Sequence, residues 1–152
     1  LSFVVRYPDR RAIIEPLIAF AREELEHFHQ VYAWIEARGL QLGPDAKDDY
    51  VRRLRKLARN ESDKHLLDRL LIAAVVEARG CERFRLVAEA LEPGDLKDFY
   101  LDITRSESRH HGLFVRLAGH YFEQEEIRQR LDEILEAESD IMLSLPLRAA
   151  VH

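Results

Sequence analysis

Apolar residues recur at the spacing of an α-helix through almost the whole sequence, and residues that break helices are scarce. Only six Gly and five Pro occur among the 152 residues, and most of them stand at the edges of the periodic segments. Between residues 9 and 38, for example, the apolar positions at helical spacing are Ile13, Leu17, Phe20, Phe28, Val31 and Ile35. No strand-like alternation or internal repeat interrupts this pattern. The sequence therefore predicts an all-α fold.

Helix-breaking residues divide the chain into the segments that we expect to be helical. Pro8 closes a short stub at residues 1–7, and Gly39 is a natural stop for the helix over 9–38. After a loop, a short amphipathic helix is expected near 46–59, and Pro93-Gly94 and Pro146 then bound helices at 62–91, 95–122 and 124–143. Long helices joined by short loops and one longer connection describe a four-helix bundle. We expect such a bundle with a crossover helix and an extra C-terminal helix.

Composition limits the class of protein. Hydrophobic residues make up 47% and charged residues 34%, which suits a single soluble domain spanning residues 1–152. The net charge of −5 excludes a polycation built for nucleic acid but allows a local basic patch. One cysteine cannot form an internal disulfide, and we find no signal peptide and no apolar run of about 18 residues, so a cytoplasmic location is expected. The chain lacks a starting Met, and we expect an N-terminally truncated fragment whose first helix is largely missing.

Two Glu-x-x-His motifs, Glu24/His27 and Glu107/His110, stand on different predicted helices. Residues three apart share one face of a helix, so a carboxylate and an imidazole at this spacing can bind one ion together. Both motifs fall in line with apolar positions, where charged groups are costly unless they are paired or bound to metal. Di-iron carboxylate bundles use two such motifs together with one Glu from each of the other two helices. The pair of motifs therefore predicts a metal centre in the bundle core.

Glu77 is the expected third carboxylate, because it follows seven apolar residues and shares their inward stripe. Its height can be compared with that of Glu107 by counting from the hairpin turn. Glu77 lies 16 residues before Pro93, and Glu107 lies 13 residues after Gly94. At the rise of an α-helix, their heights differ by only about 4–5 Å. Antiparallel helices would thus bring both carboxylates to one level, and Glu82 is the alternative ligand if Glu77 is not one.

The expected ligand set is Glu24, His27, Glu77, Glu107 and His110. Counting in the same way from the turn at Pro8, the partner of Glu24 on the preceding helix should lie as far before Pro8 as Glu24 lies after it. A fourth carboxylate is therefore expected on a helix upstream of Leu1. Carboxylates and imidazoles without thiolates suit iron or manganese, and a paired site with open positions can bind dioxygen. Glu23 is a candidate for orienting an opposite imidazole through its free N–H group.

Several stretches of the chain resemble the bacterial tRNA 2-methylthio-isopentenyladenosine hydroxylases, which are ferritin-like di-iron proteins. The most specific one reads Glu77-Ala78-Arg79-Gly80-Cys81-Glu82-Arg83-Phe84, and the others are residues 23–28, 66–71, 99–100 and 105–110. The resemblance covers roughly residues 12–145. It implies a non-haem di-iron monooxygenase that hydroxylates the isopentenyl group of a modified adenosine in tRNA. Two iron ions, dioxygen and electrons from a reductase or ferredoxin would be required, and the five ligands above match family positions.

A basic stripe on the predicted helix at 46–59 bears on the tRNA. Apolar residues line one side of this segment, and the other side carries Arg52, Arg55, Lys56 and Arg59. Such a stripe can bind phosphates, although a merely solvated face is an equally good interpretation. We expect these four residues to contact tRNA and expect no membrane partner.

Two other functions remain open from the sequence. The chain can be another ferritin-like di-iron oxidase or an iron-storage protein, and a large oligomer would favour storage. It can also be a metal-free structural bundle whose inward Glu and His residues simply pair. Metal analysis of the purified protein separates this last reading from the other two.

Overall fold

The computed structural model describes residues 2–44 and 48–146, apart from the side chain of His111. Within these ranges every regular element is an α-helix and no strand occurs. Helices account for well over two thirds of the described residues, so the prediction of an all-α chain is confirmed. The chain divides into two compact units, residues 1–46 and 47–152, which are described separately.

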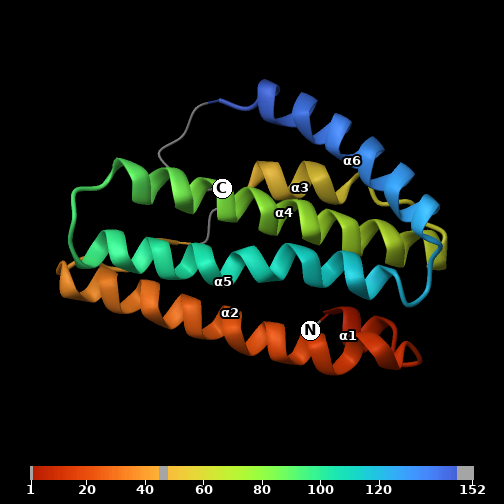
Figure 1. Cartoon of the computed structure of the whole chain (residues 1–152), viewed down its shortest axis with the longest axis horizontal. Coiled ribbons are helices and arrows are strands. Elements are labelled where there is room, and N and C mark those ends of the chain that lie inside the picture. The colour runs from red at the N-terminus through yellow and green to blue at the C-terminus, as the bar shows by residue number, and fades with distance from the viewer. Residues whose placement is uncertain (1, 45–47, 147–152) are drawn as a thin grey trace. The chain divides into compact units, whose positions relative to one another are not determined.

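The first unit consists of helices α1 (Ser2–Arg6) and α2 (Arg11–Ala37) (Figure 1). Ile13 and Leu17 are buried near the start of α2, but Phe28 and Val31 are 56% and 40% exposed. The sequence pattern names Phe28 and Val31 among the apolar positions at helical spacing. Within this unit only the five-residue α1 accompanies α2, and it is too short to cover the second half of the longer helix.

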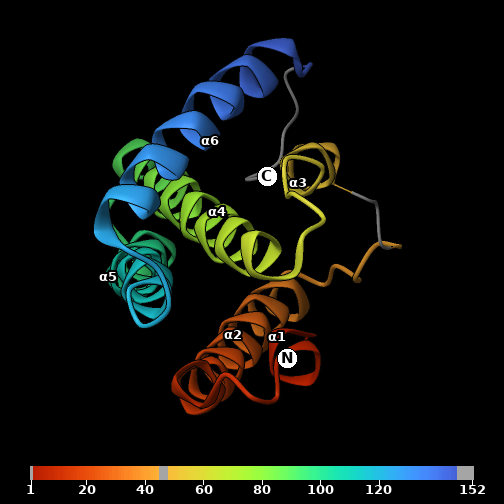
Figure 2. The same ribbon diagram turned by 90° about the vertical axis from the view of Figure 1, so that its right-hand side faces the viewer.

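The second unit is built on the hairpin of α4 (Ser62–Ala90) and α5 (Asp95–Ala118). These two helices run antiparallel and side by side over most of their length (Figures 1 and 2). Gly94 has a φ of +153°, a conformation that L side chains rarely adopt, so the tight turn between the helices requires glycine there. The apolar run before Glu77 supplies much of the core, including Leu66, Leu67, Leu70 and Leu71.

Helix α3 (Asp49–Arg55) is shorter than the predicted segment at 46–59, of which residues 46 and 47 lie outside the described part of the chain. Asp48 caps its start by accepting hydrogen bonds from the backbone N–H groups of Tyr50 and Val51. The helix ends early because the backbone N–H of Arg59 donates to the Asp68 carboxylate at 2.7 Å. The segment after Arg55 is therefore drawn out of the helix towards α4.

Two fully buried carboxylates fix α3 and α6 (Gln124–Ser144) to α4. Asp68 accepts hydrogen bonds from the guanidinium groups of Arg59 and Arg130 at 2.8–3.2 Å. Burial alone would raise the pKa of Asp68, but these hydrogen bonds outweigh it, and the pKa is lowered. Asp68 is thus held as a carboxylate, and through Arg130 it connects α6 to α4.

Glu138 of α6 is the second of these carboxylates. Arg79 donates to both of its oxygens at 2.8 Å, and the Tyr50 hydroxyl donates to Oε1 at 3.0 Å. Burial and the charge of Glu138 raise the pKa of Tyr50, so this hydroxyl keeps its proton. One carboxylate therefore connects α3, α4 and α6.

Candidate metal centre

The α4–α5 hairpin brings three of the predicted ligands together. Nδ1 of His110 lies 2.9 Å from Oε2 of Glu107 and 3.9 Å from Oε2 of Glu77. One donor atom from each residue falls within 4.8 Å of the others. The equal heights expected from the turn length account for this convergence, because Glu77 and Glu107 stand on neighbouring antiparallel helices.

The three converging side chains are largely buried, as expected of ligands in a metal centre. The side chains of His110, Glu107 and Glu77 are only 4%, 6% and 16% exposed. Two carboxylates directed at one imidazole in a low-dielectric core repel each other unless a cation lies between them. Two oxygens and a nitrogen, without a thiolate, form a donor set that fits iron or manganese. The residues present therefore fit the metal that the sequence predicts, and their role as ligands stays a prediction.

Glu24 and His27 stand on α2, in the first unit. Nδ1 of His27 lies 3.6 Å from Oε1 of Glu24, and the side chain of His27 is 15% exposed. The two groups thus share one face of the helix, as the three-residue spacing requires. Glu23 is exposed beside them. That Glu24 and His27 complete the metal centre, and that Glu23 orients a ligand, both stay predictions.

Cys81 lies one turn beyond Glu77 and points at the backbone of α5. Its Sγ lies 3.6 Å from the carbonyl oxygen of Thr104. Burial raises the pKa of the Cys81 thiol, and the nearby charge of Glu107 raises it further. A thiol held in its neutral form is a poor metal ligand, because the thiolate is the binding form. Glu82, the alternative ligand, is instead exposed and paired with Arg79 at 2.7 Å.

The four residues of the predicted basic stripe do not share one environment in the structure. Arg52 pairs with Asp49 at 2.9 Å, and Arg59 lies beyond α3 with its guanidinium on Asp68. Arg55 and Lys56 are exposed, and neither pairs with a carboxylate in the described ranges. Only these two keep the accessible charge that the prediction of tRNA contact needs.

Asp68 and Glu138 are important residues that the sequence reasoning missed. Asp68 carried a weak signal, because Asp68 and Arg69 together interrupt an otherwise apolar segment from Leu66 to Leu71. Glu138 carried none, since it stands in the acidic segment 136–140 and its partner Arg79 lies 59 residues earlier. Both carboxylates are saturated by hydrogen bonds and serve the architecture of the unit.

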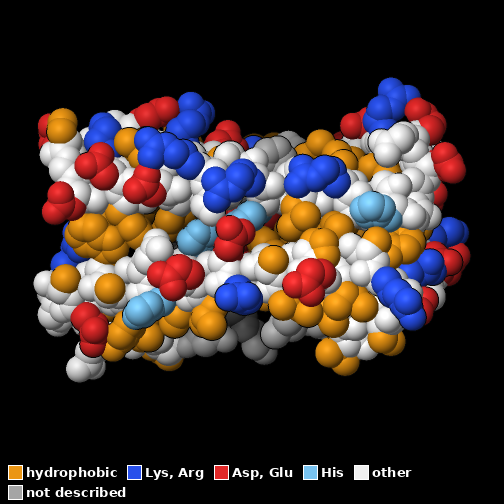
Figure 3. All heavy atoms as spheres, turned by 60° about the horizontal axis from the view of Figure 1, so that its bottom comes forward, with side chains coloured by type: hydrophobic (Ala, Val, Ile, Leu, Met, Phe, Trp, Pro, Cys, Tyr) orange, Lys and Arg blue, Asp and Glu red, His pale blue; other side chains and the backbone are white. Residues whose placement is uncertain are grey.

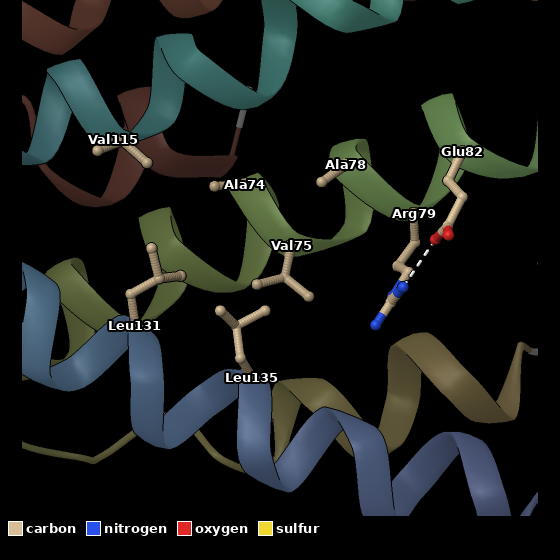
Figure 4. A pocket seen from close by; sticks show the side chains of 8 residues that line it. All are labelled: Ala74, Val75, Ala78, Arg79, Glu82, Val115, Leu131 and Leu135. Carbon is tan, nitrogen blue, oxygen red and sulfur yellow. Dashed lines mark hydrogen bonds and ion pairs between the residues drawn. The ribbon is translucent and has the colours of Figure 1, made fainter.

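An apolar cavity of about 510 Å³ lies between α4, α5 and α6. Figure 4 shows aliphatic side chains facing each other across it, with the Arg79–Glu82 pair at one side. Its lining residues are Ala74, Val75, Ala78, Arg79, Glu82, Val115, Leu131 and Leu135. None of the three converging ligand residues is among them, so this cavity is a feature separate from the candidate metal centre.

The face of the protein shown in Figure 3 mixes charges of both signs with apolar side chains. No helix in the described part of the chain is both long and apolar enough to cross a lipid bilayer.

Comparisons with known proteins show the family of the chain. A family described as tRNA-(MS(2)IO(6)A)-hydroxylase (MiaE) matches residues 1–152. A tRNA 2-(methylsulfanyl)-N(6)-isopentenyladenosine(37) hydroxylase of Pseudomonas putida is 33% identical over 144 residues, covering 95% of this chain and 70% of that protein. The hydroxylase of the same name from Salmonella typhimurium is 35% identical over 137 residues, and the match covers 90% of this chain and 50% of that protein.

The fold also matches a solved structure. A Synechococcus protein with aldehyde deformylating oxygenase activity superposes with a TM-score of 0.90 at 35% identity, over 99% of this chain and 74% of that one. This match confirms the ferritin-like helical class. From the match over its whole length and from both curated relatives, the chain belongs to the MiaE family of tRNA hydroxylases.

Proposed function

We propose that the protein is a non-haem iron monooxygenase that hydroxylates the isopentenyl group of 2-(methylsulfanyl)-N(6)-isopentenyladenosine in tRNA. The observation that carries the proposal is the buried convergence of Glu77, Glu107 and His110 on the α4–α5 hairpin. Membership of the hydroxylase family supplies the substrate. We place the reaction in the cytoplasm because tRNA is the substrate.

The ligand set in this proposal is Glu24 and His27 from α2 together with Glu77, Glu107 and His110 from the hairpin. Two iron ions held there would supply the activation of dioxygen, with electrons from a separate reductase or ferredoxin. The chain itself holds the donors at fixed heights on rigid helices and keeps water away by burial. Glu23 is proposed to orient a ligand imidazole, and Arg55 and Lys56 to contact tRNA phosphates.

The test is aerobic turnover of tRNA that carries the isopentenyl modification by the iron-loaded protein with a chemical reductant. Mass spectrometry of the digested nucleosides should show the modified adenosine with one added oxygen atom. His110→Ala should abolish this product. His65→Ala is the matched control, because His65 is a part-buried histidine of α4 whose Nδ1 contacts the Arg59 carbonyl rather than the ligand cluster. Product formation by His110→Ala at the parent rate would contradict the proposal.

A second candidate function is an oxygenase that acts on an aldehyde. The match to the Synechococcus protein over 99% of the chain favours it. The same iron-loaded protein, supplied with an aldehyde in place of tRNA, distinguishes the two. Turnover of the aldehyde without any change in the tRNA nucleosides would favour this second function.

A further inference from the structure

A row of exposed arginines runs along α5 on the face away from the ligand cluster. Arg105 and Arg109 are one turn apart, and Arg116 lies two turns beyond Arg109. At 100° per residue these positions lie on the opposite face of α5 from Glu107 and His110. We propose that this arginine row binds the phosphate backbone of the RNA substrate. The inference rests on the proposed function and names a surface for it.

Arg105 pairs with Asp102, one turn away, so its charge is already neutralised. The partners of Arg109 and Arg116 set these two members of the row apart from other surface arginines. Arg52, Arg85 and Arg128 each pair with a carboxylate one turn away at 2.7–3.0 Å. Arg109 instead donates to the Ser106 hydroxyl and the Arg105 carbonyl, at 3.2 and 3.3 Å. Arg116 has no carboxylate partner among the described residues. Their charge is therefore not neutralised locally, and it remains available to an external anion.

Gly112 shapes the row between its last two members. A Cβ atom placed on Gly112 would lie 3.0 Å from Nη1 of Arg116, so that guanidinium lies back over the glycine, towards Arg109. Glycine inside a helix is unfavourable for the free energy of folding, but here it leaves the surface free for the guanidinium. Arg109 and Arg116 thus lie on one face of α5 in a protein whose net charge is −5. Such a local row fits a polyanion better than a single small anion.

An exposed aromatic ring stands just beyond the row. His120 follows the end of α5 at Ala118, and its ring packs against that of Tyr121 with centroids 6.3 Å apart. Arginines beside an exposed ring are the combination that binds single-stranded RNA, since phosphates meet the guanidinium groups and a base stacks on the ring. The row and His120 together therefore favour an unpaired RNA loop as the ligand.

The experiment measures tRNA affinity against salt concentration for the parent protein and matched variants. In Arg109→Gln/Arg116→Gln the slope of log affinity against log salt should shrink by about one per arginine, and affinity at low salt should fall at least about tenfold. Arg128→Gln on α6 removes a charge that is already paired and should change neither value. His120→Ala should weaken binding without changing the slope, because stacking releases no counterions.

Iron content and thermal unfolding of each variant serve as checks that the fold is intact. An unchanged slope and affinity in Arg109→Gln/Arg116→Gln would overturn the inference while leaving the proposed function in place. The same result together with a loss in Arg55→Gln/Lys56→Gln would assign the contact to α3 instead. A parent protein that binds no tRNA at any salt concentration would contradict the proposed function itself, and the inference with it.

Discussion

Buried carboxylates occur in two different settings within the second unit. One setting holds helices together, and the other forms the candidate metal centre. Asp68 and Glu138 are fully buried, and hydrogen bonds saturate the oxygens of both. Asp68 accepts from two guanidinium groups, and Glu138 accepts from one guanidinium group and the Tyr50 hydroxyl. Glu77 and Glu107 instead converge on each other and on the imidazole of His110. A saturated carboxylate holds helices together, whereas converging carboxylates leave room for a cation to stabilise them. The two settings should therefore differ in how strongly they respond to substitution and to metal.

The largest expected effect is on stability at the saturated carboxylates. Asp68→Asn should lower the free energy of unfolding by about 3–5 kcal/mol, because it leaves the Arg59 and Arg130 guanidinium groups without their buried counter-charge. Glu107→Gln in the metal-free protein should change it by about 1 kcal/mol or less, since the amide still accepts a hydrogen bond from His110. Urea denaturation of both variants measures the difference. Equal losses would remove the distinction between the two settings.

Lowering the pH should destabilise the protein by protonating Asp68. The pKa of Asp68 in the folded protein lies below its ordinary value of 3.8, so its contribution to stability is complete above that value. This contribution is lost as the pH falls below 3.8 and through the lowered pKa. The denaturation midpoint of the parent should therefore drop steeply in this range. Asp68→Asn should show a shallower dependence, and an identical pH profile for both proteins would count against the assignment.

Substitution of Tyr50, which donates a hydrogen bond to Glu138, should cause a loss of stability of intermediate size. Tyr50→Phe should cost about 1.5–3 kcal/mol, because it removes a buried hydrogen bond to a charged acceptor. The raised pKa of Tyr50 means that its stabilising effect is complete below the ordinary value of 10.0 and is lost as the pH rises above it. Alkaline denaturation should thus be less steep in Tyr50→Phe than in the parent. No difference above pH 10 would indicate that the hydroxyl is not buried on Glu138.

The smallest effect is expected at exposed pairs on the surface. Arg128 and Glu125 form an ion pair at 2.7 Å, but their side chains are 71% and 73% exposed. Glu125→Gln should change the free energy of unfolding by about 0–1 kcal/mol, because water and salt screen the pair. A loss as large as that of Asp68→Asn would show that burial is not what separates these carboxylates.

The sequence predicted those parts of the protein that depend on local periodicity and on the length of one turn. Glu77 and Glu107 were placed at one height because only the tight Pro93-Gly94 hairpin lies between their helices. The position of Arg59 was not predictable, because its backbone N–H group, beyond the end of α3, donates to Asp68, nine residues further along the chain. The role of Glu138 also depends on a distant partner, Arg79, which no local pattern reveals.

Local sequence patterns also do not determine whether the motif on α2 joins the ligands on the α4–α5 hairpin, so this joining stays a prediction. Glu24 and His27 share a helical face, as expected from their spacing. Their joining with Glu77, Glu107 and His110 in one centre depends on how the two units assemble. Metal binding tests this joining directly, because a shared centre makes each motif depend on the other.

The most direct test of the account is iron bound per chain, measured by elemental analysis after anaerobic loading with Fe(II) and removal of free metal. The parent protein should retain two iron ions per chain, as a centre built from both motifs and Glu77 implies. His27→Ala and His110→Ala should each lose most of this iron, whereas His65→Ala, outside the cluster, should keep it. Parent-level iron in both His27→Ala and His110→Ala would contradict a metal centre at these residues.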